Sequence, residues 1–184
     1  MRLTGGTLGG RRIAGPASRG VRPTPGRVKE ALFSMLGSRT IGARFLDLYA
    51  GTGAIGFEAL SRGASEVTFV EERPRVAKQI AVTAAALGFG RDRAHVVTAR
   101  AERAVERLQG RYDLVFADPP YALGLPERII RRLHERGLVD ERSLVIYEHA
   151  SRAEVGAPAG FAAERHAAYG EVALTFLRPE PVPS

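Results

Sequence analysis

The residues best suited to chemistry in this sequence are an acid, two prolines and an aromatic residue in direct succession, Asp118, Pro119, Pro120 and Tyr121. Two consecutive prolines cannot continue a strand ladder, and each keeps the residue before it extended, so we expect a stiff corner here. At such a corner, the Asp118 carboxylate and the Pro119 carbonyl can accept the two N–H groups of one conjugated amine. This pairing localises the nitrogen lone pair, which can then attack an electrophilic carbon while Tyr121 stacks on the planar substrate. The alternative is a strand-ending turn with a surface acid.

A second set of residues has the spacing of a nucleotide-binding loop. Gly51, Gly53 and Gly56 fit the pattern G-x-G-x-x-G, and Glu71 follows about 20 residues after the first glycine, where a carboxylate can accept ribose hydroxyls. This pattern alone would indicate NAD. However, Asp47 stands four residues before Gly51, where its charge would repel a pyrophosphate but can help to hold a cationic amino group. The resulting D-x-x-x-G-x-G pattern resembles the signature loop of class I S-adenosylmethionine-dependent methyltransferases.

These residues need strands and helices to position them, and the sequence alternates between the two. The predicted strands are 45–49, 67–71, 95–98, 112–117 and 144–148, and the predicted helices are 26–36, 54–61, 74–87, 102–108 and 126–135. Residues 162–168 and 171–178 are predicted to form two antiparallel strands that turn at Gly170. Apolar strands alternating with helices predict a parallel sheet that is covered on both faces.

The fold class is therefore α/β. We expect a doubly wound, seven-stranded, mostly parallel sheet with a C-terminal antiparallel hairpin, as in Rossmann-like class I methyltransferases. Ligands of such sheets bind beyond the carboxyl ends of the strands. Glu71, Asp118 and the glycine loop that follows Asp47 all lie at predicted strand ends of this kind, which predicts a common site.

Charge and composition divide the chain into two parts. The net charge of the 184 residues is +7, and residues 1–44 hold nine basic side chains against one acid. We expect a basic N-terminal extension with a short helix over residues 1–40, and the methyltransferase domain over residues 41–184. A basic extension on a near-neutral domain favours a polyanionic partner such as nucleic acid, although a solvated tail is the alternative.

The chain has no cysteine and no long apolar run, which indicates a cytoplasmic protein without a membrane partner.

The N-terminal residues point to a narrower family. Residues 5–12 and the run VRPTPGRVKEALF at residues 21–33 resemble the opening of the RsmD family. Residues 45–62 and 118–121 resemble the same family, so the resemblance covers essentially the whole chain. Members of this family are bacterial enzymes that methylate the exocyclic N2 amine of a specific guanine in 16S ribosomal RNA.

The resemblance implies a place for the cofactor, S-adenosyl-L-methionine, which leaves as S-adenosyl-L-homocysteine. It implies that the methionine end lies along Asp47, Gly51 and Gly53, that Glu71 holds the ribose, and that Asp118 lies beside the bound cofactor. Related enzymes often carry Asn or Asp before Ala after the third strand, to hold the adenine amine. The matching pair here is Arg100-Ala101. An arginine side chain has no acceptor, so the backbone or another residue must make that contact.

The resemblance also assigns the chemistry and the RNA contacts. Asp118 would be the catalytic carboxylate, supported by the Pro119 carbonyl, and Tyr121 the platform for the base. No metal is required. The residues expected to contact the RNA or to lie near the target nucleotide are Arg11, Arg12, Arg22, Thr24 and Arg27, and for Arg27 an ordinary helix-surface role is the alternative.

The partner implied is 16S rRNA or the assembled 30S particle, bound by a monomeric enzyme. Other amino-methyltransferases that act on adenine, cytosine or a protein glutamine share the Asp-Pro-Pro-Tyr tetrad, so they remain alternatives. A nicotinamide oxidoreductase and an RNA-binding module without catalysis are the alternatives from other classes.

Overall fold

A computed structural model describes residues 2–13, 25–120, 127–153 and 155–181 of the chain. Its strands are β1 Arg44–Asp47, β2 Glu66–Glu71, β3 Ala94–Thr98, β4 Leu114–Ala117, β5 Leu144–Ala150, β6 Phe161–Tyr169 and β7 Val172–Pro179. They form one seven-stranded sheet in the order β3-β2-β1-β4-β5-β7-β6. β1 to β5 pair in parallel, whereas β7 pairs antiparallel with both β5 and β6. The predicted fold class is therefore confirmed, including the C-terminal antiparallel hairpin.

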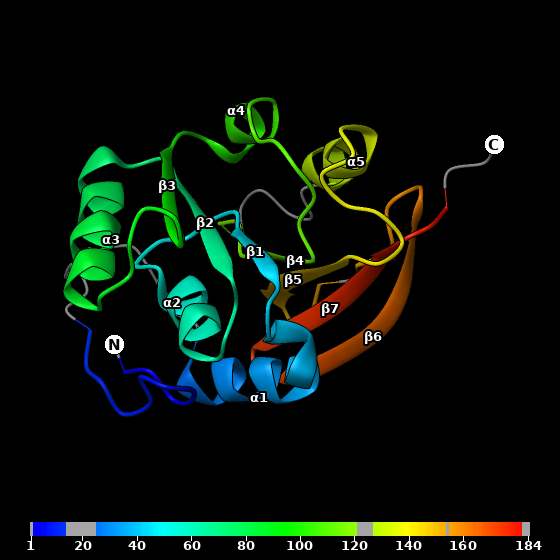
Figure 1. The fold of residues 1–184 in the computed structure, drawn as a ribbon. Helices are drawn as coiled ribbons and strands as arrows, with labels where there is room; N and C mark the ends of the chain where they lie inside the picture. Colours follow the sequence, from blue (N-terminus) through cyan, green and yellow to red (C-terminus); the bar gives the residue numbers. More distant parts are fainter. Residues whose placement is uncertain (1, 14–24, 121–126, 154, 182–184) are drawn as a thin grey trace.

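Helices cover both faces of this sheet, as Figure 1 shows. They are α1 Gly26–Leu36, α2 Ala54–Ser61, α3 Pro74–Ala86, α4 Ala101–Val105 and α5 Glu127–Glu135, with a 3-10 turn, η1, at Gly37–Thr40. Successive strand residues point to opposite faces, so Phe45 joins the core under α1, α2 and α3 while Leu46 joins the core under α4 and α5. The sheet is thus the middle layer of three.

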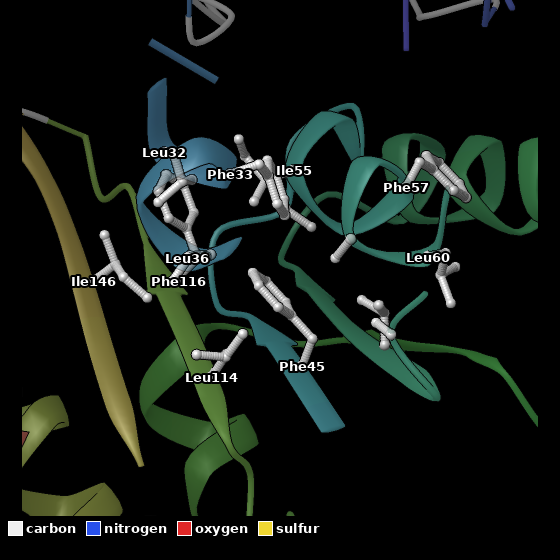
Figure 2. Close-up of a cluster of buried hydrophobic side chains, with 14 of the residues drawn as sticks. Leu32, Phe33, Leu36, Phe45, Ile55, Phe57, Leu60, Leu114, Phe116 and Ile146 are labelled. Atoms are coloured by element: carbon white, nitrogen blue, oxygen red, sulfur yellow. The ribbon is translucent and has the colours of Figure 1, made fainter. Parts of the chain in front are cut away.

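The core beneath α1 and α2 sets the order of the central strands. Figure 2 shows Phe45, Phe116 and Ile146, from β1, β4 and β5, beside Leu32 and Phe33 of α1. The rings of Phe33 and Phe45 stack with centroids 6.4 Å apart. Packing these side chains into one core places β4 between β1 and β5, and so brings the carboxyl ends of these three strands together.

Several element ends differ from the prediction. β1 ends at Asp47 and not at residue 49, because the N–H of Leu48 donates to Phe116 of β4 and the N–H of Ala50 donates to Val70 of β2. Past Asp47 the backbone thus bonds first to β4 and then to β2, and the regular pairing of β1 stops. β4 begins two residues later than predicted, since the N–H of Tyr112 donates to Leu138 outside the sheet. α4 is shorter than predicted and ends at residue 105.

The N-terminal residues are more ordered than an irregular arm. Arg2 and Arg12 form an antiparallel bridge, and the N–H of Leu3 donates to the carbonyl of Arg11 at 3.0 Å. Leu3 and Ile13 are buried in the core that α1 and α2 share. Within residues 2–13, the extension is therefore a hairpin packed on the rest of the fold, while the proposed division at residue 40 remains a prediction.

A buried ion pair ties this hairpin to both helices. The Glu58 side chain of α2 is fully buried, and Lys29 of α1 lies 2.8 Å from it. Glu58 also accepts hydrogen bonds from the N–H of Thr4 at 2.9 Å and from Arg62 at 2.8 Å. Burial raises the pKa of Glu58, but the hydrogen bonds from Lys29, Thr4 and Arg62 outweigh it and lower the pKa below its ordinary value. Glu58 therefore stays ionised and holds three segments together.

Candidate active site

Asp47 ends β1 inside the protein and faces the first turn of α2. Its side chain is 1% exposed, and it accepts a hydrogen bond from the N–H of Gly56 at 3.1 Å. Burial raises its pKa to about 7, the Gly56 N–H opposes this increase, and the charge of Glu71 adds to it. Asp47 thus holds the glycine loop against the start of α2, and it keeps a buried acid next to that loop.

The glycine loop follows β1 closely because it carries no side chains where it turns. Gly53 has a φ of +79°, a left-handed conformation that glycine adopts without strain. A Cβ atom at Gly56 would lie 2.2 Å from the ring of Phe69 on β2. The start of α2 therefore packs directly on β2, with Gly53 and Gly56 buried and Gly51 partly exposed.

Glu71 ends β2 and is linked to the same loop. One of its carboxylate oxygens accepts the N–H of Gly51 at 3.0 Å, and the other accepts the N–H and Nε of Arg73 at 3.0 and 2.8 Å. Arg73 is a site residue that the sequence analysis missed. The only signal for it is its position before Pro74, where α3 begins. Its guanidinium neutralises Glu71, which is 5% exposed.

Asp118 follows β4 at the same edge of the sheet. Burial raises its pKa to about 8, and the nearby carboxylates of Glu148 and Asp47 add to the increase. Pro119 is buried and Pro120 is exposed, so the corner runs from the interior to the surface. Tyr121 lies outside the described residues. A carboxylate at this corner can accept an N–H of a substrate amine, and any positive charge that develops there is stabilised by the surrounding acids.

Glu148 is a second residue that the sequence analysis missed. It lies on β5, and the parallel register pairs Ala117 with Tyr147, so Asp118 and Glu148 occupy the next position on adjacent strands. A glutamate within the apolar run LVIYEHA is indistinguishable from an ordinary strand residue until the strand order is known.

A hollow of about 490 Å³ opens at the carboxyl ends of β2 and β3, where Glu72 follows Glu71. Its lining consists of Glu72, Thr98, Ala99, Arg100, Arg103 and Arg107. Arg100 precedes α4 and lies 3.4 Å from Glu72, whereas Ala101 is buried as the first residue of α4. Of the predicted Arg100-Ala101 pair, only Arg100 therefore contributes its side chain to this hollow.

The described residues fit an adenosine-bearing ligand. Gly51 and Gly53 both have positive φ, and a Cβ atom at Gly53 would lie 2.7 Å from the ring of Phe57, so the turn after β1 is built tightly from glycine backbone. The buried Tyr49 hydroxyl of this loop has no hydrogen-bond partner in the described part of the chain. Burial raises its pKa above the ordinary value, with smaller effects of Glu102, Tyr147 and Glu72, so the hydroxyl stays protonated and can donate to a ligand or water.

The residues predicted to contact RNA are only partly brought to this edge. Arg27 is exposed, and a Cβ at Gly170 would lie 3.2 Å from its guanidinium, so Arg27 lies at the turn between β6 and β7. That turn is at the carboxyl end of β5, where Ala150 pairs with Val172. Arg11 and Arg12 are exposed on the N-terminal hairpin. Arg22 and Thr24 lie outside the described residues.

The described residues offer neither a metal cluster nor a membrane-spanning helix. No group of three or more His, Cys, Asp or Glu side chains in this part of the chain could hold a metal ion. None of the described helices has the length and apolar character needed to cross a bilayer.

The chain matches known proteins over nearly its whole length. The family described as Conserved hypothetical protein 95 matches residues 1–178. Ribosomal RNA small subunit methyltransferase D of Escherichia coli K12 is 36% identical over 183 residues, which are 98% of this chain and 90% of that protein. The protein of the same name from Haemophilus influenzae is 35% identical over 150 residues, which are 80% of this chain and 78% of that protein.

Solved structures agree with this relationship. The methyltransferase candidate yhhF of Escherichia coli has a TM-score of 0.86 at 34% identity, and the match covers 99% of both chains. A protein of Thermus thermophilus, described as hypothetical, has a TM-score of 0.80 at 32% identity, again over 99% of both chains. This chain therefore belongs to the RsmD family, the family of ribosomal RNA small subunit methyltransferase D.

Proposed function

We propose that this protein transfers the methyl group of S-adenosylmethionine to the exocyclic N2 amine of one guanine in 16S rRNA. The observation that carries the proposal is that Asp47 and Asp118 lie at the same edge of the sheet: Asp47 pairs with Phe116 of the adjacent parallel strand, two residues before Asp118. An acid beside a ligand-binding glycine loop thus lies next to an acid suited to hold an amine. The names of the relatives from Escherichia coli and Haemophilus influenzae support small-subunit rRNA as the substrate.

The cofactor, when bound, supplies an electrophilic methyl carbon on a sulfonium. Glu71 would hold its ribose, and Gly51 and Gly53 would line its methionine end. Arg73 covers part of Glu71, so its guanidinium has to share that carboxylate with the ribose hydroxyls. The Tyr49 hydroxyl and the hollow around Arg100 would receive the adenine end, where the family's usual Asn or Asp is absent.

The residues of the corner would act on the substrate amine. Asp118 accepts one N–H of the amine and the Pro119 carbonyl accepts the other, so the nitrogen lone pair points away from both. The new N–C bond forms as the C–S bond breaks, and the proton that the nitrogen loses passes to Asp118 or to solvent. Tyr121 would stack on the flipped base. This mechanism uses positioning and electrostatics, and it requires no metal.

Contacts with the rest of the RNA would come from the basic residues. Arg27 lies at the sheet edge that carries Asp118, and Arg11 and Arg12 are exposed on the hairpin. We expect a monomeric enzyme that acts in the cytoplasm on 16S rRNA or on the 30S particle. The assay below distinguishes these two substrates.

The test is methyl transfer with labelled S-adenosylmethionine. Naked 16S rRNA and 30S particles are supplied in separate reactions, and the RNA is then digested and its nucleosides are identified. We expect N2-methylguanosine at one site, and loss of transfer in Asp118→Ala with cofactor binding retained. Asp92→Ala, which changes an exposed aspartate, is the matched control. The proposal would be overturned if the labelled methyl group were found on adenine, cytosine or protein. Full activity of Asp118→Ala would overturn it as well.

A further inference from the structure

The hollow at the carboxyl ends of β2 and β3 has a basic wall. Arg100, Arg103 and Arg107 line it, and Glu72 is the one acid among the described residues of its lining. Arg100 lies 3.4 Å from Glu72, so these two charges balance each other. Arg103 and Arg107 are both exposed. The hollow therefore presents two cations that its own lining does not neutralise.

Arg103 and Arg107 lie on one side of α4 and the turn that follows it. They are four residues apart, and the N–H of Arg107 donates to the carbonyl of Ala104 at 2.8 Å, which continues the helical path. Like charges at this spacing repel each other. Within the described ranges of the chain, neither side chain forms an ion pair or a hydrogen bond. The nearby acid Glu106 bonds instead to Arg132 of α5 at 2.7 Å. The packing of α4 therefore does not account for the two charges.

The cofactor supplies no anion to this wall either. The strand-end side of the hollow is proposed above for the adenine, which is a neutral ring. S-adenosylmethionine has no phosphate, and its one carboxylate belongs to the methionine end, proposed to lie along Gly51 and Gly53. A guanidinium group matches phosphate oxygens through its paired N–H donors. The wall thus fits phosphates, which the RNA substrate would bring to this edge.

The wall lies on the same edge of the sheet as the catalytic corner. β3 stands three places from β4 in the sheet, which is about 14 Å at about 4.8 Å per strand. Arg27 lies on the other side of β4, at the turn between β6 and β7. An RNA strand that presents its guanine to Asp118 has nucleotides on both sides of that guanine. Those on the β3 side can reach α4.

We infer that Arg103 and Arg107 bind phosphates of the RNA substrate, a few nucleotides from the target guanine. This inference rests on the proposed function, to which it adds a contact surface. Phosphate contacts fix the position and register of a nucleic acid but carry no sequence information. Both arginines are therefore binding residues that act on RNA affinity and not on the chemical step.

The test is the salt dependence of RNA binding by the double variant Arg103→Ala/Arg107→Ala. The affinities for naked 16S rRNA and for 30S particles are measured between about 50 and 200 mM salt. We expect the slope of log affinity against log salt concentration to become shallower by about 0.7–0.9 for each arginine removed. The KM for RNA should rise, whereas kcat at saturating RNA and the affinity for S-adenosylmethionine should not change.

Two further double variants make the result specific. Arg91→Ala/Arg142→Ala removes the same charge from the opposite edge of the sheet, because these exposed residues precede β3 and β5. It should keep the wild-type slope. Arg103→Lys/Arg107→Lys retains both charges and should also keep the slope, since counterion release depends on charge. Thermal unfolding shows whether each variant folds.

Three outcomes would overturn the inference. The first is a wild-type slope in Arg103→Ala/Arg107→Ala. The second is an equally shallow slope in Arg91→Ala/Arg142→Ala, which would indicate an effect of total charge. The third is weaker binding of S-adenosylmethionine with an unchanged RNA slope, which would assign the arginines to the cofactor.

Failure of the proposed function gives a different result. A wild-type protein that binds RNA through Arg103 and Arg107 but methylates no guanine would overturn the proposed function alone. A wild-type protein that neither binds nor methylates 16S rRNA or 30S particles would overturn both.

Discussion

The last residue of β1 holds the first turn of α2: the Asp47 carboxylate accepts the N–H of Gly56 at 3.1 Å. Gly56 in turn lies so close to Phe69 that a Cβ atom there would be 2.2 Å from the ring. The carboxylate, the loop and the neighbouring strand therefore form one closely packed unit at the proposed cofactor site.

Gly56→Ala should disturb this unit. The added methyl group forces the Phe69 ring or the helix to move, and overpacking of this kind costs about 1–3 kcal/mol of unfolding free energy. Chemical denaturation measures the loss, and cofactor affinity should fall with it. Gly26→Ala is the matched control, because a Cβ at Gly26 meets no atom within 4 Å. Equal stability of the two variants would show that α2 can shift freely on β2.

Asp118→Asn should stabilise the ligand-free protein at pH 8. The pKa of Asp118 is raised to about 8, so between pH 4 and 8 the native chain holds a proton that the unfolded chain has released. Stability therefore falls as the pH rises through this window. The amide removes this dependence, and we expect the melting temperature at pH 8 to rise by at least about 2 °C. Parallel melting curves of both proteins from pH 5 to 8 would contradict this.

Cofactor affinity should also depend on pH. A sulfonium beside Asp118 and Asp47 favours their ionised forms, so binding releases protons at neutral pH. The affinity for S-adenosylmethionine should rise as the pH increases toward about 8, by up to about tenfold per unit if one proton is released. S-adenosylhomocysteine carries no sulfonium and should show a weaker dependence. Calorimetry with both ligands across this range tests the difference, and identical pH profiles would refute it.

Lys29→Met should be strongly destabilising. The variant removes the buried one of the two cations that contact the fully buried Glu58, and breaking a buried ion pair from one side costs about 3–5 kcal/mol. Urea denaturation gives the value. Arg39→Met is the control, since the Arg39–Glu164 pair is exposed on both sides and should contribute about 0–1 kcal/mol. Similar losses of unfolding free energy in the two variants would mean that the packing of the hairpin, α1 and α2 does not depend on the buried ion pair of Glu58.

RNA binding should become less sensitive to salt when Arg11 and Arg12 are both changed to alanine. Each phosphate contact contributes about −0.7 to −0.9 to the slope of log affinity against log salt concentration. Because residues 2–13 are packed on the core, point variants are a better test than removal of the hairpin. Arg131→Ala, on the exposed side of α5, should leave the slope unchanged. A double variant with the wild-type slope would place the RNA elsewhere.

Much of the fold could be predicted from local patterns. The helices at residues 26–36 and 54–61 were predicted with the bounds that the structure has, because apolar spacing and the following glycine mark both their faces and their ends. The strand ends were less accurate. Where β1 stops depends on the carbonyls of Phe116 and Val70, which come from other parts of the chain.

The N-terminal hairpin shows the same limit. Residues 2–13 are rich in glycine and arginine and have no clear periodicity, so they indicated an irregular arm. What orders them is the buried Glu58 on α2 together with the core position of Leu3. Neither contact leaves a signal in the hairpin's own sequence.

The sequence by itself determined which residues could do chemistry: the spacing of Asp47, Gly51 and Gly53, and the Asp-Pro-Pro-Tyr corner, are properties of short segments. Only the tertiary structure decided that Glu148 stands beside Asp118 and that Arg73 covers Glu71. Local backbone preferences act over a few residues, whereas neighbours across strands follow from the order in which the packed core sets those strands.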